Sequence, residues 1–175
     1  MNTFLQGPLH KSNKIFAIGI YGSGKTTYAK EYARLTGFPF IDFDHHFDYV
    51  KPNSDIDFLD RLPERYTTDA IPWNPKGGST ELFRRYAKDN GVKIVCCVCP
   101  DRDIWMYRLL VRKGIEMSDD RYIHYAEYYR KILPLYLELD ICFYDTIENK
   151  YITKEQLYER IAWIDGYRRE DSSKS

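Results

Sequence analysis

A glycine-rich stretch, Gly19 to Thr26, limits what this chain can fold into more than any other part of the sequence. It reads Gly-Ile-Tyr-Gly-Ser-Gly-Lys-Thr, which matches the pattern G-x-x-x-x-G-K-[ST] at every fixed position. An apolar, strand-like run from Lys14 to Ile20 leads into it, and a helical pattern from about Lys25 to Leu35 leads out of it. The sequence therefore predicts a strand, a tight loop and a helix in direct succession.

Short apolar runs of the same kind recur along the chain and alternate with longer stretches of helical character. Most of these runs are continuous, as is typical of strands covered on both faces. This order predicts an α/β chain with three layers: a five-stranded, mostly parallel sheet and helices on both faces. The expected strands are 14–20, 38–42, 66–71, 92–99 and 140–144. The expected helices are 25–35, 54–62, 79–90, 101–113, 119–133 and 153–163, with Gly37 ending the first and Thr153 capping the last.

The chain has 175 residues and a mass of 20.9 kDa, which is enough for one compact domain. We expect that domain over residues 1–167, followed by a frayed polar tail over 168–175. Lys plus Arg number 26 and Asp plus Glu number 26, so the net charge does not favour nucleic-acid or membrane binding. No apolar run approaches the ~20 residues of a membrane span, and the start lacks a signal peptide, which predicts a cytoplasmic protein.

Three of the four cysteines fall in one apolar run, at Cys96, Cys97 and Cys99. Cys96 and Cys99 have C-x-x-C spacing, but neither a second cysteine pair nor a suitably spaced histidine accompanies them. Burial as small apolar side chains is therefore favoured over a zinc or redox site.

Glycines in the loop allow the backbone to turn through positive φ and to bring unshielded N–H groups to an anion. Those amides and the amino terminus of the following helix suit the phosphates of a nucleotide. Lys25 is expected to reach the β and γ phosphates, and the Thr26 hydroxyl to bind Mg²⁺. A chance glycine-rich turn is the alternative, which the complete match between strand and helix disfavours. The candidate nucleotide-binding residues are Gly19, Gly22, Ser23, Gly24, Lys25, Thr26 and Thr27.

This short loop, near the start of a chain of 175 residues, resembles that of the small P-loop kinases. These include the adenylate, shikimate and gluconate kinases and the kinase domain of polynucleotide kinase. The resemblance implies the P-loop NTPase fold, ATP and Mg²⁺ as cofactors, and phosphoryl transfer as the reaction. The guanine-specificity motif N/T-K-x-D of GTPases is absent from the sequence.

A second match follows the second expected strand, at Asp42-Phe43-Asp44-His45-His46. It looks like the D-x-D of shikimate kinases and the D-G-D-x-x-H of gluconate kinases, which implies carboxylates that hold the acceptor and approach the metal. On that basis Asp44 would orient the acceptor hydroxyl and accept its proton, Asp42 would approach Mg²⁺, and His45 would contact the acceptor. The alternative is a capped turn with a pair of surface histidines.

A third match, Tyr66 to Trp73, resembles the strand ending D-G-[FY]-P-R of adenylate-kinase-like enzymes. It implies that Asp69 is the Walker B carboxylate beside Mg²⁺. Trp73 stands where that family has an arginine for the acceptor's phosphate, which favours a hydroxyl acceptor. Trp73 and Phe43 border the expected acceptor site and are candidates to stack on a base.

Arginines gather after the fourth expected strand, where kinases of this class close a lid over the nucleotide. We expect the lid over residues 102–121, with Arg108 and Arg112 as catalytic residues on one helix face. A solvent-facing amphipathic helix is the alternative. Acidic residues gather over 43–65, which we interpret as a substrate-side insertion, with a solvated surface loop as the alternative.

Together these patterns predict an ATP-dependent kinase that transfers the γ-phosphoryl group to a hydroxyl of a small acceptor of nucleoside or nucleotide type. Two alternatives remain open. One is a kinase acting on a hydroxyl of nucleic acid, either a polynucleotide or a modified base, and the other is a nucleotide-binding regulator without acceptor chemistry. The expected partners are ATP and a small-molecule acceptor; a membrane is not expected, and the zero net charge does not favour nucleic acid.

Overall fold

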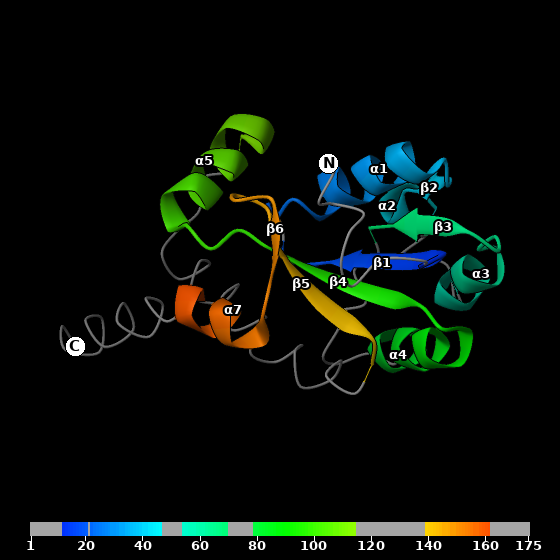
Figure 1. Cartoon of the computed structure of the whole chain (residues 1–175). Coiled ribbons are helices and arrows are strands. Elements are labelled where there is room, and N and C mark those ends of the chain that lie inside the picture. Colours follow the sequence, from blue (N-terminus) through cyan, green and yellow to red (C-terminus); the bar gives the residue numbers. More distant parts are fainter. Residues whose placement is uncertain (1–11, 21, 47–53, 70–78, 115–138, 162–175) are drawn as a thin grey trace, which may run out of the picture.

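A computed structural model describes residues 12–20, 22–46, 54–69, 79–114 and 139–161. Their strands form one six-stranded sheet in the order β2-β3-β1-β4-β5-β6 (Figure 1). Neighbouring strands are parallel except for β5 and β6, which are antiparallel. The strands are β1 (Lys14–Ile18), β2 (Phe40–Ile41), β3 (Tyr66–Thr68), β4 (Lys93–Val98), β5 (Ile141–Asp145) and β6 (Lys150–Ile152).

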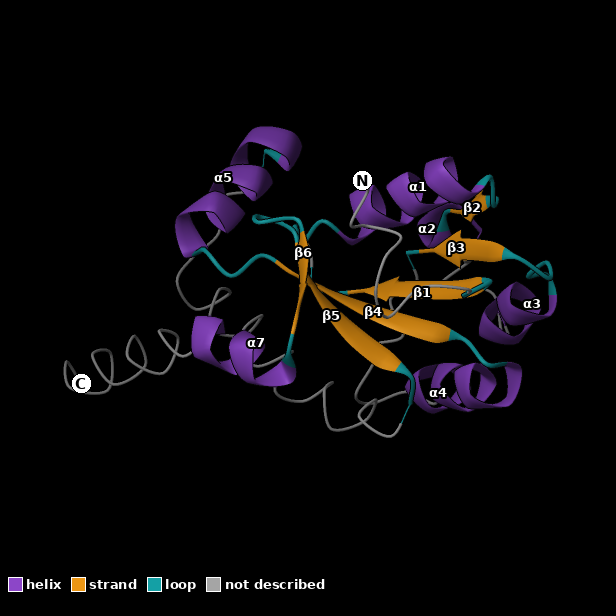
Figure 2. Ribbon diagram, viewed as in Figure 1, coloured by secondary structure: helices purple, strands orange, loops and turns teal. Residues whose placement is uncertain are grey.

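Helices cover both faces of this sheet, as predicted. Figure 2 shows α1 on one side of the central strands and α4 on the other. The helices are α1 (Lys25–Thr36), α2 (Phe43–His46), α3 (Ser54–Asp60), α4 (Ser79–Asn90), α5 (Arg102–Lys113) and α7 (Lys154–Ile161).

The central strand β1 is buried on both of its faces. Ile15 packs with Tyr28 of α1 in one apolar cluster. The next residue, Phe16, points to the opposite face, where its ring centroid lies 5.8 Å from that of Phe83 in α4. Successive side chains of a strand point to opposite faces of the sheet. A strand that helices cover on both faces therefore needs apolar residues at every position.

Strand register places three strand ends at one edge of the sheet. Phe16 of β1 lies opposite Thr68 of β3, and Ile18 lies opposite Cys96 of β4. Loops that follow these parallel strands therefore meet at the same edge, which is where open α/β sheets bind their ligands.

The sheet differs from the prediction in its strand number and strand ends. A sixth strand, β6, pairs antiparallel with β5 after a turn in which Asn149 has a φ of 54°. We missed β6 because a strand of three residues carries almost no periodicity. β1 also ends earlier than expected, since Gly19 and Ile20 belong to the loop. The helix expected over 119–133 lies outside the described residues.

The predicted helix signals at Gly37 and Thr153 are confirmed. Gly37 ends α1 in the left-handed conformation, and its N–H donates to the carbonyl of Ala33 at 2.8 Å. Thr153 forms a reciprocal capping box with Gln156, in which each backbone N–H donates to the other's side chain, at 2.9 and 3.1 Å.

The cysteines pack as small apolar side chains, as predicted. Cys96, Cys97, Cys99 and Cys142 are all buried, and burial raises the pKa of the Cys142 thiol to about 12. Among the described residues, no helix is long and apolar enough to cross a membrane.

Candidate active site

The glycine-rich loop leaves the carboxyl end of β1 and enters α1 at Lys25. Gly19 allows the chain to turn here, because a Cβ at this position would lie 2.4 Å from Ser23 Oγ and 2.7 Å from the carbonyl oxygen of Cys97. The N–H of Ser23 donates to the carbonyl of Ile20 at 3.0 Å and closes the loop. A larger residue at position 19 would therefore push the loop away from β4.

The amino end of α1 faces the loop without a capping side chain. Gly24 is the N-cap, with a φ of 92°, and the first turn of α1 carries no acidic residue. The first backbone N–H groups of a helix have no partner within that helix. This end of α1 therefore offers amides and a positive dipole to an anion.

Lys25 brings positive charge to the same place. Its side chain belongs to a residue that is only 8% exposed. Burial raises the pKa of the neighbouring Cys97 thiol, and the charge of Lys25 partly offsets that rise. Thr27 is exposed on the same first turn. Lys25 and the uncapped amino end of α1 both favour an anion, and they lie together at the loop beside β4.

A second element of the site joins α1 to the end of β3. Thr26 Oγ1 donates to Asp69 Oδ2 at 2.7 Å, and the N–H of Phe43 donates to Asp69 Oδ1 at 2.9 Å. Asp69 is 6% exposed. One buried carboxylate thus links the helix after the loop, the strand β3 and the start of α2.

These oxygens fit a magnesium ion. Mg²⁺ prefers oxygen ligands and usually keeps water and phosphate oxygens in its shell. The Thr26 hydroxyl could enter that shell, and the Asp69 carboxylate would orient it and add negative charge nearby. In the described part of the chain, no group of three or more His, Cys, Asp or Glu side chains could hold a metal ion by itself, so phosphates and water would supply the remaining ligands.

The D-x-D segment follows β2 and forms the short helix α2. Asp42 Oδ1 accepts the N–H of His45 at 3.3 Å, so Asp42 caps this helix, and His45 is exposed. The structure brings the start of α2 to Asp69 through the Phe43 amide. The side chains of Asp44 and Arg112, and the whole of Trp73, lie outside the described residues.

Phe43 is buried in the hydrophobic core, so the expectation that its ring stacks on a base is wrong. It is 2% exposed, and its ring centroid lies 5.0 Å from that of Phe58 and 5.8 Å from that of Phe83. Burial of this ring anchors α2 to α3 and α4.

Comparison with known proteins identifies this architecture. No protein-family model matches the chain. The crystal structure of a gluconokinase from Sinorhizobium meliloti is similar to this one with a TM-score of 0.52, over 93% of this chain and 97% of that one, at 18% sequence identity. The chain has the fold of a small P-loop kinase.

A shikimate kinase from Parabacteroides distasonis is 42% identical to this chain over 55 residues. The match covers 30% of this chain and 31% of the shikimate kinase. The chain thus matches about a third of that relative's length, and the fold similarity extends over nearly the whole chain.

In this P-loop kinase fold, Arg108 of α5 lies against the glycine-rich loop. Its Nη1 donates to the carbonyl of Gly22 at 3.3 Å and to Thr146 Oγ1 at 3.0 Å, and its Nη2 donates to the carbonyl of Thr146 at 3.2 Å. Trp105 and Leu109, both buried, pack α5 next to Gly22. Residues 102–113 of the expected lid are therefore a helix packed on the loop, and residues 115–121 lie outside the described residues.

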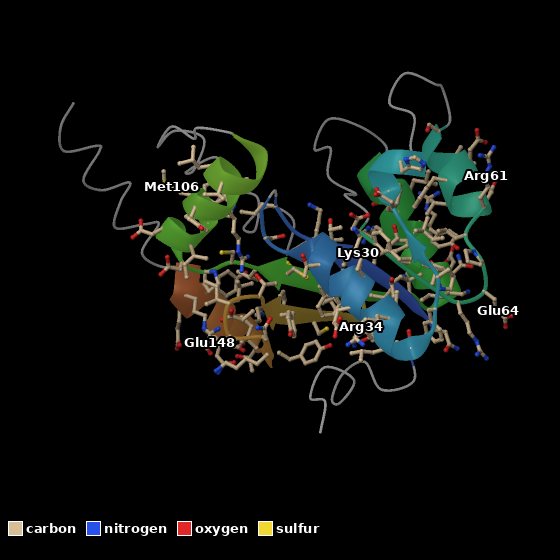
Figure 3. The ribbon with its side chains drawn as sticks, turned by 90° about the horizontal axis from the view of Figure 1, so that it is seen from above. Lys30, Arg34, Arg61, Glu64, Met106 and Glu148 are labelled. Atoms are coloured by element: carbon tan, nitrogen blue, oxygen red, sulfur yellow. The ribbon has the colours of Figure 1, made fainter. Side chains whose placement is uncertain are left out.

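A cavity of about 270 Å³ lies beyond this contact, between the start of α5, the β5–β6 turn and α7. Its apolar lining comes from Pro100, Ile104 and Ile147, and its charged lining includes Glu148 and Arg160. Figure 3 places Glu148 at the end of the molecule that carries α5 and α7, away from the outer side of α1 with Lys30 and Arg34.

Sequence reasoning missed Arg160. It lies on α7 and pairs with the buried carboxylate of Asp145, and it reaches Glu148 at 3.4 Å. Nothing in the sequence marks this arginine, because its partner lies at the end of β5, before the β5–β6 turn, and the two residues meet only through the way α7 packs.

Proposed function

We propose that this chain is an ATP-dependent kinase that transfers the γ-phosphoryl group to a hydroxyl of a small molecule. The observation that carries this proposal is the hydrogen bond between Thr26 and Asp69 directly after the loop that holds Lys25. A loop with amides and a lysine binds phosphates, and a threonine with a buried carboxylate suits the metal that accompanies them. The two similar proteins are named a shikimate kinase and a gluconokinase, which supports a small hydroxyl compound as acceptor.

Each group in the site would have a separate task. The loop amides and the amino end of α1 would bind the phosphate oxygens, and Lys25 would neutralise charge on the transferring group. Mg²⁺, when bound, would screen the phosphates and help to align them. Asp69 would hold the Thr26 hydroxyl in position, so catalysis would rest mainly on positioning and charge.

For the acceptor, we propose a compound of nucleoside or nucleotide type whose hydroxyl lies near Asp44. A hydroxyl profits from a carboxylate that accepts its proton, whereas a phosphate acceptor is already ionised. The cap formed by Asp42 and the bond from Phe43 to Asp69 hold the backbone of α2 next to the Thr26–Asp69 pair. His45 and Trp73 are further candidates for acceptor contacts.

Label transfer from γ-labelled ATP tests the proposal. We would incubate the chain with Mg²⁺, labelled ATP and separate panels of nucleosides, nucleotides, polyols and sugar acids, and single-stranded oligonucleotides. Transfer to one small hydroxyl compound, lost in the Asp44→Asn variant while ATP still binds, is the expected result. Transfer to oligonucleotides alone, with affinity that falls steeply as salt rises, would instead support the nucleic-acid alternative. ATP binding without transfer to any acceptor would support the other alternative, a nucleotide-binding regulator without acceptor chemistry.

A further inference from the structure

We propose that Thr146 is a positioning residue for the phosphate-binding loop: its hydroxyl holds the peptide between Ser23 and Gly24 so that the Gly24 N–H faces the phosphates. Thr146 follows β5 and lies far from the loop in sequence, yet its Oγ1 is 2.6 Å from the carbonyl oxygen of Ser23. The inference rests on the proposed function only in requiring that the loop binds ATP.

The Thr146 hydroxyl has one proton and two carbonyl oxygens within reach. The carbonyl of Ser23 lies at 2.6 Å and the carbonyl of Val98 at 3.0 Å. The Val98 carbonyl already accepts the backbone N–H of Thr146 at 2.9 Å. The shorter contact to Ser23 therefore takes the proton, and the same hydroxyl oxygen accepts from Arg108 Nη1 at 3.0 Å.

Holding the Ser23 carbonyl also sets the direction of an amide. In a planar trans peptide, the C=O of one residue and the N–H of the next point in opposite directions. The chain has no cis peptide among its described residues. A carbonyl of Ser23 that points to Thr146 therefore aims the N–H of Gly24 away from Thr146, and Gly24 is the N-cap of α1.

Gly24 shows how closely Thr146 approaches the loop. A Cβ on Gly24 would lie 3.0 Å from Thr146 Cγ2 and 3.2 Å from Thr146 Oγ1. Glycine at this position thus serves two purposes: it adopts a φ of 92°, and it leaves room for the threonine.

Thr146 is itself held from three sides. Asp145 Oδ1 accepts the N–H groups of Ile147 and Glu148 at 2.8 and 3.0 Å, which fixes the turn after β5. Arg160 of α7 pairs with the other oxygen of Asp145, and Arg108 of α5 donates to the Thr146 carbonyl. A side chain held in this way can act as a fixed support for the loop rather than as a mobile surface residue.

This role predicts a specific kinetic pattern. An amide that binds phosphate equally in the ground state and the transition state contributes to KM and leaves kcat unchanged. Thr146→Val keeps the shape and removes the hydroxyl. We expect the Kd and KM for ATP to rise roughly tenfold, in line with the loss of one well-placed hydrogen bond, and kcat to stay within about twofold.

The experiment compares ATP with adenosine by calorimetry, for the wild-type chain, Thr146→Val and Thr146→Ser. We expect weaker ATP binding in Thr146→Val, unchanged adenosine binding, and recovery in Thr146→Ser, which restores the hydroxyl. Thr36→Val is the matched control, because Thr36 donates to the carbonyl of Tyr32 at 2.7 Å at the opposite end of α1; it should bind ATP as the wild type does.

The outcomes separate this inference from the proposed function. Equal ATP affinity in Thr146→Val and the wild type would overturn the role of Thr146 alone. An equal loss of ATP and adenosine binding would overturn it too, since Thr146 would then act on the base or on the fold. A wild-type chain that does not bind ATP would overturn both the role of Thr146 and the proposed kinase activity. ATP binding without phosphoryl transfer would overturn only the proposed kinase activity.

Discussion

The hydroxyl of Thr26 donates to the carboxylate of Asp69 at 2.7 Å, although 43 residues separate them along the chain. Thr26 follows the lysine of the loop, and Asp69 follows β3, which pairs directly with β1. The two side chains meet because parallel neighbouring strands end at the same edge of the sheet. This pair is the most direct place to test the site.

Asp69→Asn should reduce phosphoryl transfer roughly 100-fold, because it removes a negative charge beside the proposed Mg²⁺ site while an amide still fits the space. The affinity for ATP measured without Mg²⁺ should stay unchanged. Steady-state rates and ATP titrations with and without EDTA check both expectations. Asp89→Asn, an exposed site on α4, is the control, and an equal rate loss in this control would contradict a specific role for Asp69.

Lys25→Ala should weaken ATP binding roughly 100-fold, in line with the loss of charge-assisted hydrogen bonds to phosphate. Lys30→Ala is the control, because Lys30 lies on the outer side of the same helix (Figure 3), with its Nζ 5.6 Å from the centroid of the Phe40 ring. This variant should leave the Kd for ATP unchanged. Calorimetry on both variants decides the matter, and retained affinity in Lys25→Ala would remove the basis for a phosphate-binding loop.

Gly19→Ala should destabilise the fold more than Gly37→Ala. Both glycines have positive φ, but a Cβ on Gly37 meets nothing within 4 Å, whereas a Cβ on Gly19 would lie 2.7 Å from the backbone of β4. We expect a loss of about 1 kcal/mol for Gly37→Ala, from backbone strain alone, and a larger loss for Gly19→Ala. Urea unfolding measures both, and similar midpoints for the two variants would count against the close packing of the loop on β4.

Stability should fall at alkaline pH because of tyrosines between α1, β5 and β6. Tyr28 and Tyr151 hydroxyls lie 2.7 Å apart; burial raises the pKa of both, and it raises the pKa of Tyr144 to about 12. A folded-state pKa above the unfolded value of about 10 means that the unfolded chain loses its protons first. The contribution of these tyrosines to the free energy of unfolding is therefore fully present below about pH 10, and it is lost as the pH rises toward their folded-state pKa values.

Urea midpoints between about pH 8 and pH 11 check this decline, and Tyr28→Phe should make it shallower by removing one titrating group. A midpoint that does not move over this range would show that these tyrosines titrate alike in the folded and unfolded chains.

Several parts of the fold were predictable because their signals are local. The loop pattern at Gly19 to Thr26, the stop at Gly37 and the cap at Thr153 each depend on neighbouring residues. The structure shows the expected strand before the loop, the helix end at Gly37 and the cap at Thr153. β6 was not predictable in the same way, because its three residues become a strand only by pairing with β5.

The sequence by itself determined a glycine-rich loop between a buried strand and a helix, and the alternation of apolar runs that is typical of a parallel sheet with helices on both faces. Only the tertiary structure decided which side chains surround that loop. Phe43 became core because α3 and α4 cover it, Arg108 came to the loop from 86 residues away, and Thr146 came from 123 residues away. Such contacts depend on strand order and on helix packing, and the local spacing of residues carries no information about either.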